Sequence, residues 1–358
     1  MSYTFTSESV SSGHPDKIAD IISDAVATYL IDKNPSHRAA VETLVTTNLV
    51  VLAGEYRSDK FDKERIKQVI RDVVYEIGYE QDGFNWRKLR VENKLHGQSA
   101  DIALGTEGFG AGDQGLMFGY ACTETDNYMP LAISLSKKII DNVTAYSKYG
   151  PDIKAQVSVD YAEAGKPLRV SKVVCSAQHT VKQDIETVRT DIKTVIKRCL
   201  GDWVDEGTEY LINPTGRFII GGPDGDCGVT GRKIIVDTYG GYCPHGGGAF
   251  SGKDPTKVDR SGAYMARYIA KNIVASKEVQ NCTVQLSYAI GVKQPTSVYI
   301  YADGVVRQDL VEEVLERVDL TPKGIIDRFN LFDLNLKDTA RYGHFGYDYL
   351  PWESLDLF

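Results

Sequence analysis

The chain has 358 residues, of which 42% are hydrophobic and 25% charged, and its formal net charge is −8. This length exceeds what one hydrophobic core usually holds, so we expect two or three α/β subdomains packed tightly together. The acidic balance argues against non-specific binding to nucleic acid, and an anionic substrate must therefore meet a local cluster of Lys and Arg.

The N-terminus and the cysteines indicate a reducing compartment. The first residues lack a basic start followed by an apolar run, and no stretch approaches the roughly 20 apolar residues that span a bilayer. None of the six cysteines stands in a CxxC pair. Free buried thiols are therefore favoured over disulfides or a zinc site. We expect a cytoplasmic protein that binds neither membranes nor nucleic acid.

Strand, helix and strand recur about three times along the chain. Apolar residues at helical spacing predict helices after His14-Pro15 and near residues 62–77, 184–200 and 257–276. The Val/Thr/Leu-rich segment 39–56 predicts one long strand or a hairpin, and further strands are expected at residues 153–161, 168–179, 233–238, 283–291 and 297–302. Many glycines and few apolar residues predict a mobile loop at residues 97–119. No repeat is visible in the sequence itself, so a threefold repeat rests on this order of elements.

Glycine is concentrated between Thr215 and Asp254, where 12 of the 33 glycines fall. Such density is costly in backbone entropy and is expected where the main chain turns sharply or approaches a ligand closely. Tight turns between short strands are the simpler explanation. The Arg, Lys and Asp residues interleaved with the glycines favour a ligand site.

Two segments of this region combine glycines with cations. The first, Gly-Asp-Cys-Gly-Val-Thr-Gly-Arg-Lys, ends in an Arg-Lys pair at residues 232–233, which suits a polyphosphate or, more simply, a solvated turn. The second runs from His245 through three glycines to Lys253 and leads into a helix with Lys257 at its mouth. Bare main-chain N–H groups at a helix start bind anions. Because Asp254 follows the lysine, the pattern GxxxxGK[ST] fails and an ordinary P-loop ATPase is disfavoured.

Several other polar residues are ambiguous on their own. Asp16, near the start of the first helix, could ligate Mg²⁺ or simply favour the helix start, and His14 could stabilise an alkoxide leaving oxygen. Glu42 and Glu55 lie in the segment 39–56, where charges usually face water. The pattern suggests neither a Ser-His-Asp arrangement nor a reactive Cys, and GxGxxG is absent.

Together these motifs resemble the S-adenosylmethionine synthetase (methionine adenosyltransferase) family along nearly the whole chain. The N-terminal Phe-Thr-Ser-Glu-Ser-Val-Ser-Ser-Gly-His-Pro-Asp-Lys matches the family opening, except that Ser12 stands where the family usually has Glu. Further matches are Gly-Ala-Gly-Asp-Gln-Gly from Gly110, Asn-Pro-Thr-Gly-Arg-Phe from Asn213, Gly-Gly-Pro from Gly221, and residues 245–261.

The resemblance and the order of elements together imply an α/β (α+β) fold of three similar subdomains, at residues 1–100, 108–220 and 221–358. We expect mixed sheets packed against helices in a pseudo-threefold arrangement, with a mobile active-site loop at residues 98–110. The resemblance also implies the reaction. Methionine sulfur attacks C5′ of ATP, tripolyphosphate leaves, and this product is cleaved to pyrophosphate and phosphate. A thioether is already nucleophilic, so the enzyme must supply alignment and stabilisation of the departing charge.

The resemblance implies roles for single residues, grouped by what they would contact. The catalytic group is His14, Lys154, Arg232, Lys253 and Lys257. The ATP-binding group is His14, Asp152, Lys154, Arg217, Phe218, Asp226, Arg232, Lys233, Ala249 and Lys253. The methionine-binding group is Glu55, Gln98, Asp113, Asp226 and Lys257. Two Mg²⁺ ions per site would be held by Asp16 and Asp259, and K⁺ by Glu42.

In this family each active site is completed across a homodimer interface, and two dimers commonly form a homotetramer, so the resemblance implies an inactive isolated monomer. Two other readings remain. A kinase or ligase on the same phosphate cradle would yield ADP, or AMP with pyrophosphate, and no sulfonium. A silent homologue would bind ATP and regulate a partner, but it has no need of the complete set of catalytic and metal residues.

Overall fold

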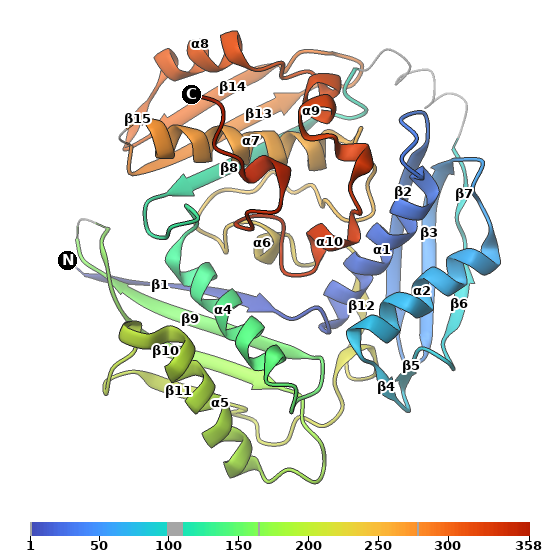
Figure 1. The fold of residues 1–358 in the computed structure, drawn as a ribbon, viewed down its shortest axis with the longest axis vertical. Helices are drawn as coiled ribbons and strands as arrows, with labels where there is room; N and C mark the ends of the chain where they lie inside the picture. Colours follow the sequence, from blue (N-terminus) through green and yellow to red (C-terminus); the bar gives the residue numbers. More distant parts are fainter. Residues whose placement is uncertain (1, 99–109, 164, 278) are drawn as a thin grey trace.

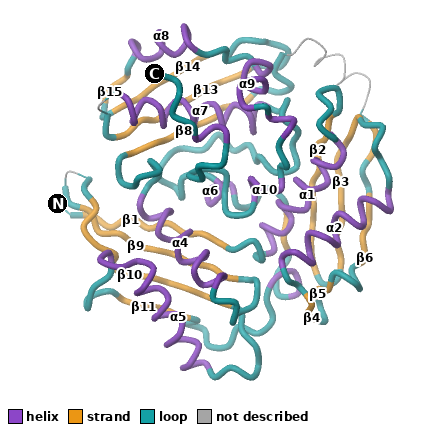
Figure 2. Tube along the Cα trace, in the orientation of Figure 1, coloured by secondary structure: helices purple, strands orange, loops and turns teal. Residues whose placement is uncertain are grey.

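Three sheets, each covered by helices, surround a common centre in the computed structural model, which describes residues 2–98, 110–163, 165–277 and 279–358 (Figures 1 and 2). This arrangement confirms the predicted fold class. In the described ranges, none of the helices has both the length and the apolar surface to span a bilayer. The loop predicted at residues 98–110 lies outside the described residues, apart from its two ends.

The first sheet has the strand order β12-β2-β3-β6, with β7 beside β3. The segment 39–56 forms a hairpin, because the chain turns at Asn48, which has a left-handed φ of 44°. Asp62 caps the second helix by accepting hydrogen bonds from its first free N–H groups. The elements of this unit are α1 (Pro15–Ile31), β2 (Arg38–Thr46), β3 (Leu49–Arg57), α2 (Lys63–Ile77), β4 (Glu80–Gln81), β5 (Phe84–Asn85), β6 (Arg90–Asn93), β7 (His96–Gly97) and β12 (Gly228–Val229).

The second sheet has the order β1-β9-β10-β11, in which only the last pair is parallel. Its strands at residues 153–161 and 168–179 and its helix at residues 184–200 were predicted and are confirmed within a few residues. The elements of this unit are β1 (Tyr3–Val10), α4 (Leu131–Ala145), β9 (Ile153–Tyr161), β10 (Pro167–Ala177), α5 (Ile185–Leu200), η1 (Gly201–Trp203) and β11 (Glu209–Ile212).

The third sheet has the order β15-β14-β13-β8 and is antiparallel throughout. The helix predicted near residues 257–276 covers it. The elements of this unit are β8 (Gly115–Cys122), α7 (Val258–Ser276), β13 (Asn281–Tyr288), β14 (Ser297–Ala302), β15 (Val305–Val306), α8 (Gln308–Arg317) and α9 (Pro322–Phe329).

Two segments differ from the sequence prediction. The loop expected at residues 97–119 runs into β8, where glycine replaces apolar side chains because the strand lies against the backbone of α7. A Cβ on Gly119 would come within 2.0 Å of Ala266. The strand expected at residues 233–238 is instead a short helix, α6 (Ile234–Asp237). A short apolar run does not distinguish strand from helix, and here tertiary contacts decide.

The C-terminal part of the chain fills the centre between the three units (Figure 1). This part includes η3 (Leu331–Asp333), α10 (Lys337–Ala340) and η4 (Pro351–Glu353). A further 3-10 helix, η2 (Gly222–Asp224), lies earlier in the chain, before β12. Helix α10 packs on α1, and η4 packs on α7. The C-terminal segment therefore joins the first unit to the third.

Each third of the sequence gives one strand to another unit. β1 pairs with β9 of the second sheet, β8 pairs with β13 of the third, and β12 pairs with β2 of the first. The exchange is cyclic, so each sheet needs a strand from another part of the chain. The boundaries expected at residues 1–100, 108–220 and 221–358 follow chain order, and as domain limits they stay a prediction.

The helices fall into an inner and an outer set. The inner helices α1, α4 and α7 contact their sheets directly, and most of their residues are buried. The outer helices α2, α5 and α8 bury a single apolar face, as their spacing predicts. The first and third units share one hydrophobic core, whereas the second unit has its own.

Charges are buried where the C-terminal segment meets α7. Arg267 donates to Glu353 over 2.9 Å, and Lys271 Nζ lies 3.0 Å from the same carboxylate oxygen. Arg267 also donates to the carbonyl of Tyr120 over 2.7 Å. Burial would raise the pKa of Glu353, but the attraction of Arg267 outweighs burial and holds it below the ordinary 4.5. This network ties η4 to the helix beneath it.

Replacing Glu353 by Gln is expected to lower the free energy of unfolding by roughly 3–5 kcal/mol, because Arg267 would stay buried without its partner. Since the folded-state pKa of Glu353 is lowered, its contribution is present above the ordinary pKa and is lost as pH falls through the folded value. Urea unfolding near neutral pH and in acid measures both effects. The exposed Glu312→Gln change should stay within about 0.5 kcal/mol, and an equally small change in both variants would contradict this role.

Candidate active site

The two glycine-rich segments lie side by side on strand β2. The Thr230 N–H donates to the carbonyl of Thr43 over 3.0 Å, and Lys253 pairs with Ala40 in an isolated antiparallel bridge. The cations at residues 232–233 and at Lys253 therefore emerge from neighbouring turns on one edge of the first sheet.

Asp16 joins the start of α1 to the first of these turns. Its Oδ2 accepts from Lys233 Nζ over 2.6 Å, and its Oδ1 accepts from the Val229 N–H over 3.0 Å. Arg232 Nε lies 3.6 Å from the same Oδ1. Burial would raise the pKa of Asp16, but the hydrogen bonds from Lys233 and Val229 outweigh it and hold the pKa below its usual value. The carboxylate is thus ionised and available to a cation.

His14 is the N-cap of α1 and is almost fully buried. Its Nδ1 accepts a hydrogen bond from the Asp16 N–H over 3.1 Å. Burial, followed by the charges of Lys233 and Lys154, lowers the pKa of His14 to about 3. The ring is therefore neutral near pH 7, and because Nδ1 is an acceptor, the proton resides on Nε2. His14 can donate one hydrogen bond from Nε2.

A cleft of about 330 Å³ opens beside His14, with Lys154 and Lys233 in its walls. Strands β1, β9 and β10 form the rest of the lining, and Glu8 contributes a carboxylate that sequence reasoning did not single out. Lys154 stands opposite Val10 in the pairing of β9 with β1. The second sheet therefore brings a further cation to the start of α1.

Asp152 is buried with one carboxylate oxygen unpaired. Its Oδ2 accepts from the Gly222 N–H over 2.9 Å, whereas Oδ1 has no hydrogen-bond partner among the residues that the structure describes. Burial raises the pKa of Asp152 to about 6. A buried acceptor without a partner is destabilising, so a ligand hydroxyl or N–H group would fit at this position.

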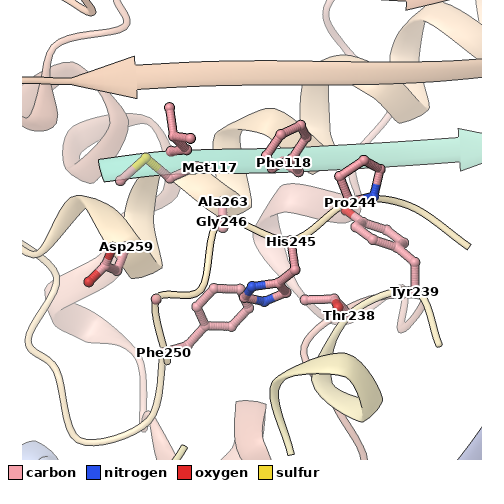
Figure 3. Close-up of a pocket in the computed structure, with 12 residues that line it drawn as sticks. Met117, Phe118, Thr238, Tyr239, Pro244, His245, Gly246, Phe250, Asp259 and Ala263 are labelled. Carbon is pink, nitrogen blue, oxygen red and sulfur yellow. The ribbon is translucent and has the colours of Figure 1, made fainter. Parts of the chain in front are cut away.

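Asp259 and Lys253 form the second ion pair of the site, with Nζ and Oδ2 2.5 Å apart. Figure 3 shows Asp259 at one side of a small pocket that also contains His245 and Phe250. The side chain of Lys257, the N-cap residue of α7, makes no capping hydrogen bond. A Cβ on Gly248 would lie 2.3 Å from the Asp259 carboxylate, so only glycine lets the main chain approach this closely.

Glu42 is exposed on β2 directly after Val41, whose N–H donates to the Gly252 carbonyl over 2.9 Å, so the predicted potassium ligand lies near the second turn. Lys257, the N-cap of α7, lies 3.7 Å from the buried Asp254. Ala249 lies against the first turn, since a Cβ on Gly231 would stand 2.7 Å from its own Cβ. Most of the predicted polyphosphate contacts are therefore brought together.

The predicted methionine group is more dispersed. Gln98 Nε2 donates to Glu55 over 3.2 Å at the end of β3, and the amide oxygen of Gln98 is buried without a partner among the described residues. The carboxylates of Asp113 and Asp226 each accept from the N–H of the residue that follows. Glu55 stands opposite Ala40 in the hairpin, so it lies one strand beyond the Lys253 bridge.

The predicted adenine contacts lie on a loop of the second unit. The Phe218 carbonyl accepts from the His179 N–H over 2.9 Å, and Arg217 is exposed beside it. This loop follows β11 and leads towards η2, whereas the cationic turns lie on the first sheet. Among the described residues, no hydrogen bond or ion pair links Arg217 or Phe218 to those turns.

Asp16 and Asp259, the predicted magnesium ligands, each lie beside a cation. Each carboxylate pairs with its own lysine, Lys233 or Lys253, and within the described ranges no cluster of three His, Cys, Asp or Glu side chains could hold a metal. Mg²⁺ is commonly held by one or two carboxylates together with substrate phosphates. The residues therefore fit a metal that binds together with a phosphate ligand.

Sequence reasoning missed the charged residues of α1 that point inward. Asp20 and Asp24 are fully buried, as are their respective partners Lys17 and Arg260. The signal was available, because Asp16, Asp20 and Asp24 recur every four residues within an otherwise apolar helix. Such spacing places all three on one face.

Models of the S-adenosylmethionine synthetase family match the chain in three parts: the N-terminal domain over residues 2–100, the central domain over 108–218 and the C-terminal domain over 220–354. The chain belongs to the S-adenosylmethionine synthetase family. It is 48% identical over 375 residues to S-adenosylmethionine synthase 2 of Rhodospirillum rubrum, which covers 99% of this chain and 96% of that relative. It is 51% identical over 364 residues to the S-adenosylmethionine synthase of Pelagibacter ubique, covering 96% and 93%.

A solved structure agrees with this membership. The unusual S-adenosylmethionine synthetase from Campylobacter jejuni has a TM-score of 0.92 to this chain at 40% identity, covering 99% of this chain and 97% of that one. The predicted family and the predicted enzyme class, a methionine adenosyltransferase, are confirmed. The roles of single residues stay predictions.

Gly248→Ala is expected to lower kcat/KM at least tenfold, because the new Cβ displaces either Asp259 or the loop that carries Lys253. Steady-state kinetics with thermal unfolding would separate activity from stability. The matched control is Gly262→Ala on α7, whose Cβ would meet the side chains of Met117 at 3.1 Å and Tyr288 at 3.4 Å rather than a carboxylate. This control should gain up to about 1 kcal/mol in helix propensity and keep its activity. Unchanged kinetics in Gly248→Ala would show that the close approach has no functional role.

Proposed function

We propose that this S-adenosylmethionine synthetase forms S-adenosylmethionine from ATP and L-methionine by direct attack of the sulfur on C5′ of ATP. The released tripolyphosphate is then hydrolysed to pyrophosphate and phosphate at the same cations. The observation that supports this most strongly is the pair of glycine-bounded cationic turns on β2, each with a lysine beside a carboxylate. Stabilisation of a departing polyphosphate requires such a cluster.

The charge balance of the site supports a role for divalent metal. The proposed catalytic and phosphate-binding set contains five cations: Lys154, Arg232, Lys233, Lys253 and Lys257. Three of these five pair with the carboxylates Asp16, Asp254 and Asp259. The remaining two positive charges cannot neutralise the several negative charges of a tripolyphosphate. Near an effective dielectric of 20, each cation about 4 Å from a phosphate charge contributes on the order of 4 kcal/mol before desolvation.

Asp16 and Asp259 would hold two Mg²⁺ ions through one carboxylate each, with phosphate oxygens completing the coordination. Bound Mg²⁺ supplies further neutralisation of phosphate charge. Glu42 would hold K⁺ beside the second turn. The ionised state of Asp16 and the open N-terminus of α7 suit these assignments.

The proposed reaction needs no nucleophilic side chain, and five of the six cysteines agree with this. Burial raises the pKa values of Cys122, Cys175, Cys243 and Cys282 to about 12 and that of Cys199 to about 11. These thiols are protonated near neutral pH and hidden from substrates. A direct displacement by the methionine thioether, without a covalent enzyme intermediate, is therefore the mechanism that the chain supports.

His14 would act at the breaking C5′–O5′ bond. Its Nε2 carries the proton because Nδ1 accepts from the Asp16 N–H. Lys154 and Lys233 line the same cleft, so a phosphate-bearing oxygen there would meet both a neutral donor and positive charge. The hydrogen bond from Nε2 would strengthen as negative charge develops on O5′.

We also propose a cytoplasmic homodimer whose subunits complete each other's sites, with two dimers forming a homotetramer. The predicted adenine contacts Arg217 and Phe218 follow the second sheet, whereas Glu55 and Gln98 lie on the first. A second subunit would bring such separated groups to one substrate. By this proposal an isolated monomer is inactive.

Incubation with ATP, methionine, Mg²⁺ and K⁺ is expected to yield a sulfonium product with equal amounts of phosphate and pyrophosphate. Mass spectrometry and ³¹P NMR detect all three products, and removal of Mg²⁺ should stop their formation because the phosphate charge is no longer neutralised. Formation of ADP, or of AMP with pyrophosphate, without the sulfonium product would instead identify a kinase or a ligase that uses the same phosphate-binding turns, and it would contradict the proposal.

His14→Asn is expected to slow adenosyl transfer roughly a hundredfold or more, because one donor to the leaving oxygen is lost. Asn is a good N-cap, so α1 should still begin correctly. Hydrolysis of added tripolyphosphate, which has no C5′–O5′ bond, should remain within several-fold of wild type. Comparing the two rates in one preparation tests the assignment, and an equal fall in both would show that His14 is not specific to the first step.

A further inference from the structure

Helix α1 carries three aspartates at successive turns, and each one accepts a hydrogen bond from the main chain of a glycine-rich segment. Asp16 accepts from Val229, Asp20 accepts from Gly231 and Asp24 accepts from Gly252. Asp16 pairs with Lys233, which lines the cleft. Asp20 and Asp24 have no exposed surface.

Asp20 holds the turn that precedes the Arg232-Lys233 pair. Its Oδ1 accepts from the Gly231 N–H over 2.9 Å, and its Oδ2 accepts from the buried Lys17 over 3.1 Å. Gly231 has a φ of +76°, in the left-handed region. The carboxylate therefore fixes a strained turn directly before the two cations.

Asp24 holds the turn that precedes Lys253. Its Oδ1 accepts from the Gly252 N–H over 2.8 Å, and Gly252 has a φ of +83°. Both carboxylate oxygens also accept from Arg260, at 2.7 and 2.6 Å. Arg260 in turn donates to the Lys253 carbonyl over 2.7 Å. Asp24 thus fixes the Gly252 N–H directly and, through Arg260, the Lys253 carbonyl.

The two sites follow the same plan. A buried aspartate takes one backbone N–H from a left-handed glycine and one buried cation, and the next residue in the chain is a phosphate-binding candidate. A buried carboxylate is expensive to desolvate, and an apolar residue of similar size often stabilises a fold as well or better. Stability therefore does not explain why α1 carries these two charges, whereas the geometry of the turns does.

We propose that Asp20 and Asp24 are positioning residues for polyphosphate binding. Asp20 orients the turn that carries Arg232 and Lys233, and Asp24 orients the turn that carries Lys253. The inference rests on the proposed function, since it assumes that these three cations meet the phosphates. Neither aspartate touches the substrate. Each fixes a main-chain turn before the ligand arrives, so that the cations need little reordering on binding.

The first experiment measures tripolyphosphate binding by isothermal titration calorimetry with Mg²⁺, using the full-length Asp20→Asn and Asp24→Asn proteins. The dissociation constant is expected to rise at least tenfold in each variant, whereas that of adenosine, which has no phosphate, should stay within twofold of wild type. Glu353→Gln is the matched control, because it also removes a buried carboxylate charge but contacts neither turn. It should keep wild-type affinity for tripolyphosphate even where its melting temperature falls.

The second experiment uses the wild-type protein and so does not depend on the folding of a variant. Hydrogen exchange should show the Gly231 and Gly252 amides protected before any ligand is added, with protection unchanged by tripolyphosphate. Fast exchange that slows only on addition of tripolyphosphate would overturn the proposal, as would equal losses of affinity in Asp20→Asn and Glu353→Gln. If the wild-type protein itself does not bind tripolyphosphate, the proposed function fails, even where both amides are protected.

Discussion

The structure depends on charges that are paired inside it, along the inner face of α1. Lys17 is fully buried between Asp20 and Asp237, at 3.1 and 2.6 Å, and Arg260 is fully buried against Asp24. Burial raises the pKa of Asp20 to about 6 in spite of the opposing charge of Lys17. An unpaired charge in this interior costs several kcal/mol. The observed arrangement of α1, α6 and the glycine turns pairs Lys17 and Arg260 with buried carboxylates, so this constraint helps to set the geometry of the site.

The cyclic exchange of strands extends this constraint to the whole molecule. β12 is the strand of the third segment that reaches the first sheet, and it ends at Val229, next to the turn that Asp20 holds. β8 lies on the backbone of α7, whose N-terminus carries Asp259. β1 leads directly into the loop before His14 and pairs with β9, which carries Lys154. Each exchanged strand therefore ends beside a residue of the site, and the site forms only when all three units fold together.

The sequence predicts secondary structure correctly where one physical rule acts alone. The outer helices α2 and α5, the hairpin β2–β3 and the strands β9 and β10 follow from apolar spacing, because each buries one face. The pattern failed where contacts between distant segments decide. The sequence predicts a loop at β8 because Gly119 stands where the strand packs against α7. It predicts a strand at α6 because the apolar run there is short. The sequence motifs predict the cations of the site but not Asp20 and Asp24, because the sequence does not show that these two carboxylates accept hydrogen bonds from a distant backbone.

Of the two explanations for the glycine-rich region, the structure shows tight turns, and it also shows a close approach of the main chain to a carboxylate, whereas the ligand site stays a prediction. Gly231 and Gly252 have left-handed φ angles, and a Cβ on Gly252 would come within 2.0 Å of the Val41 carbonyl oxygen, so these glycines build turns. Gly248 is needed for space, because its Cα faces the Asp259 carboxylate. An acidic chain can present positive charge to an anion only where several of its cations lie close together. The turns and the close approach achieve this together, because they bring backbone, lysine and aspartate within hydrogen-bond distance along a single strand.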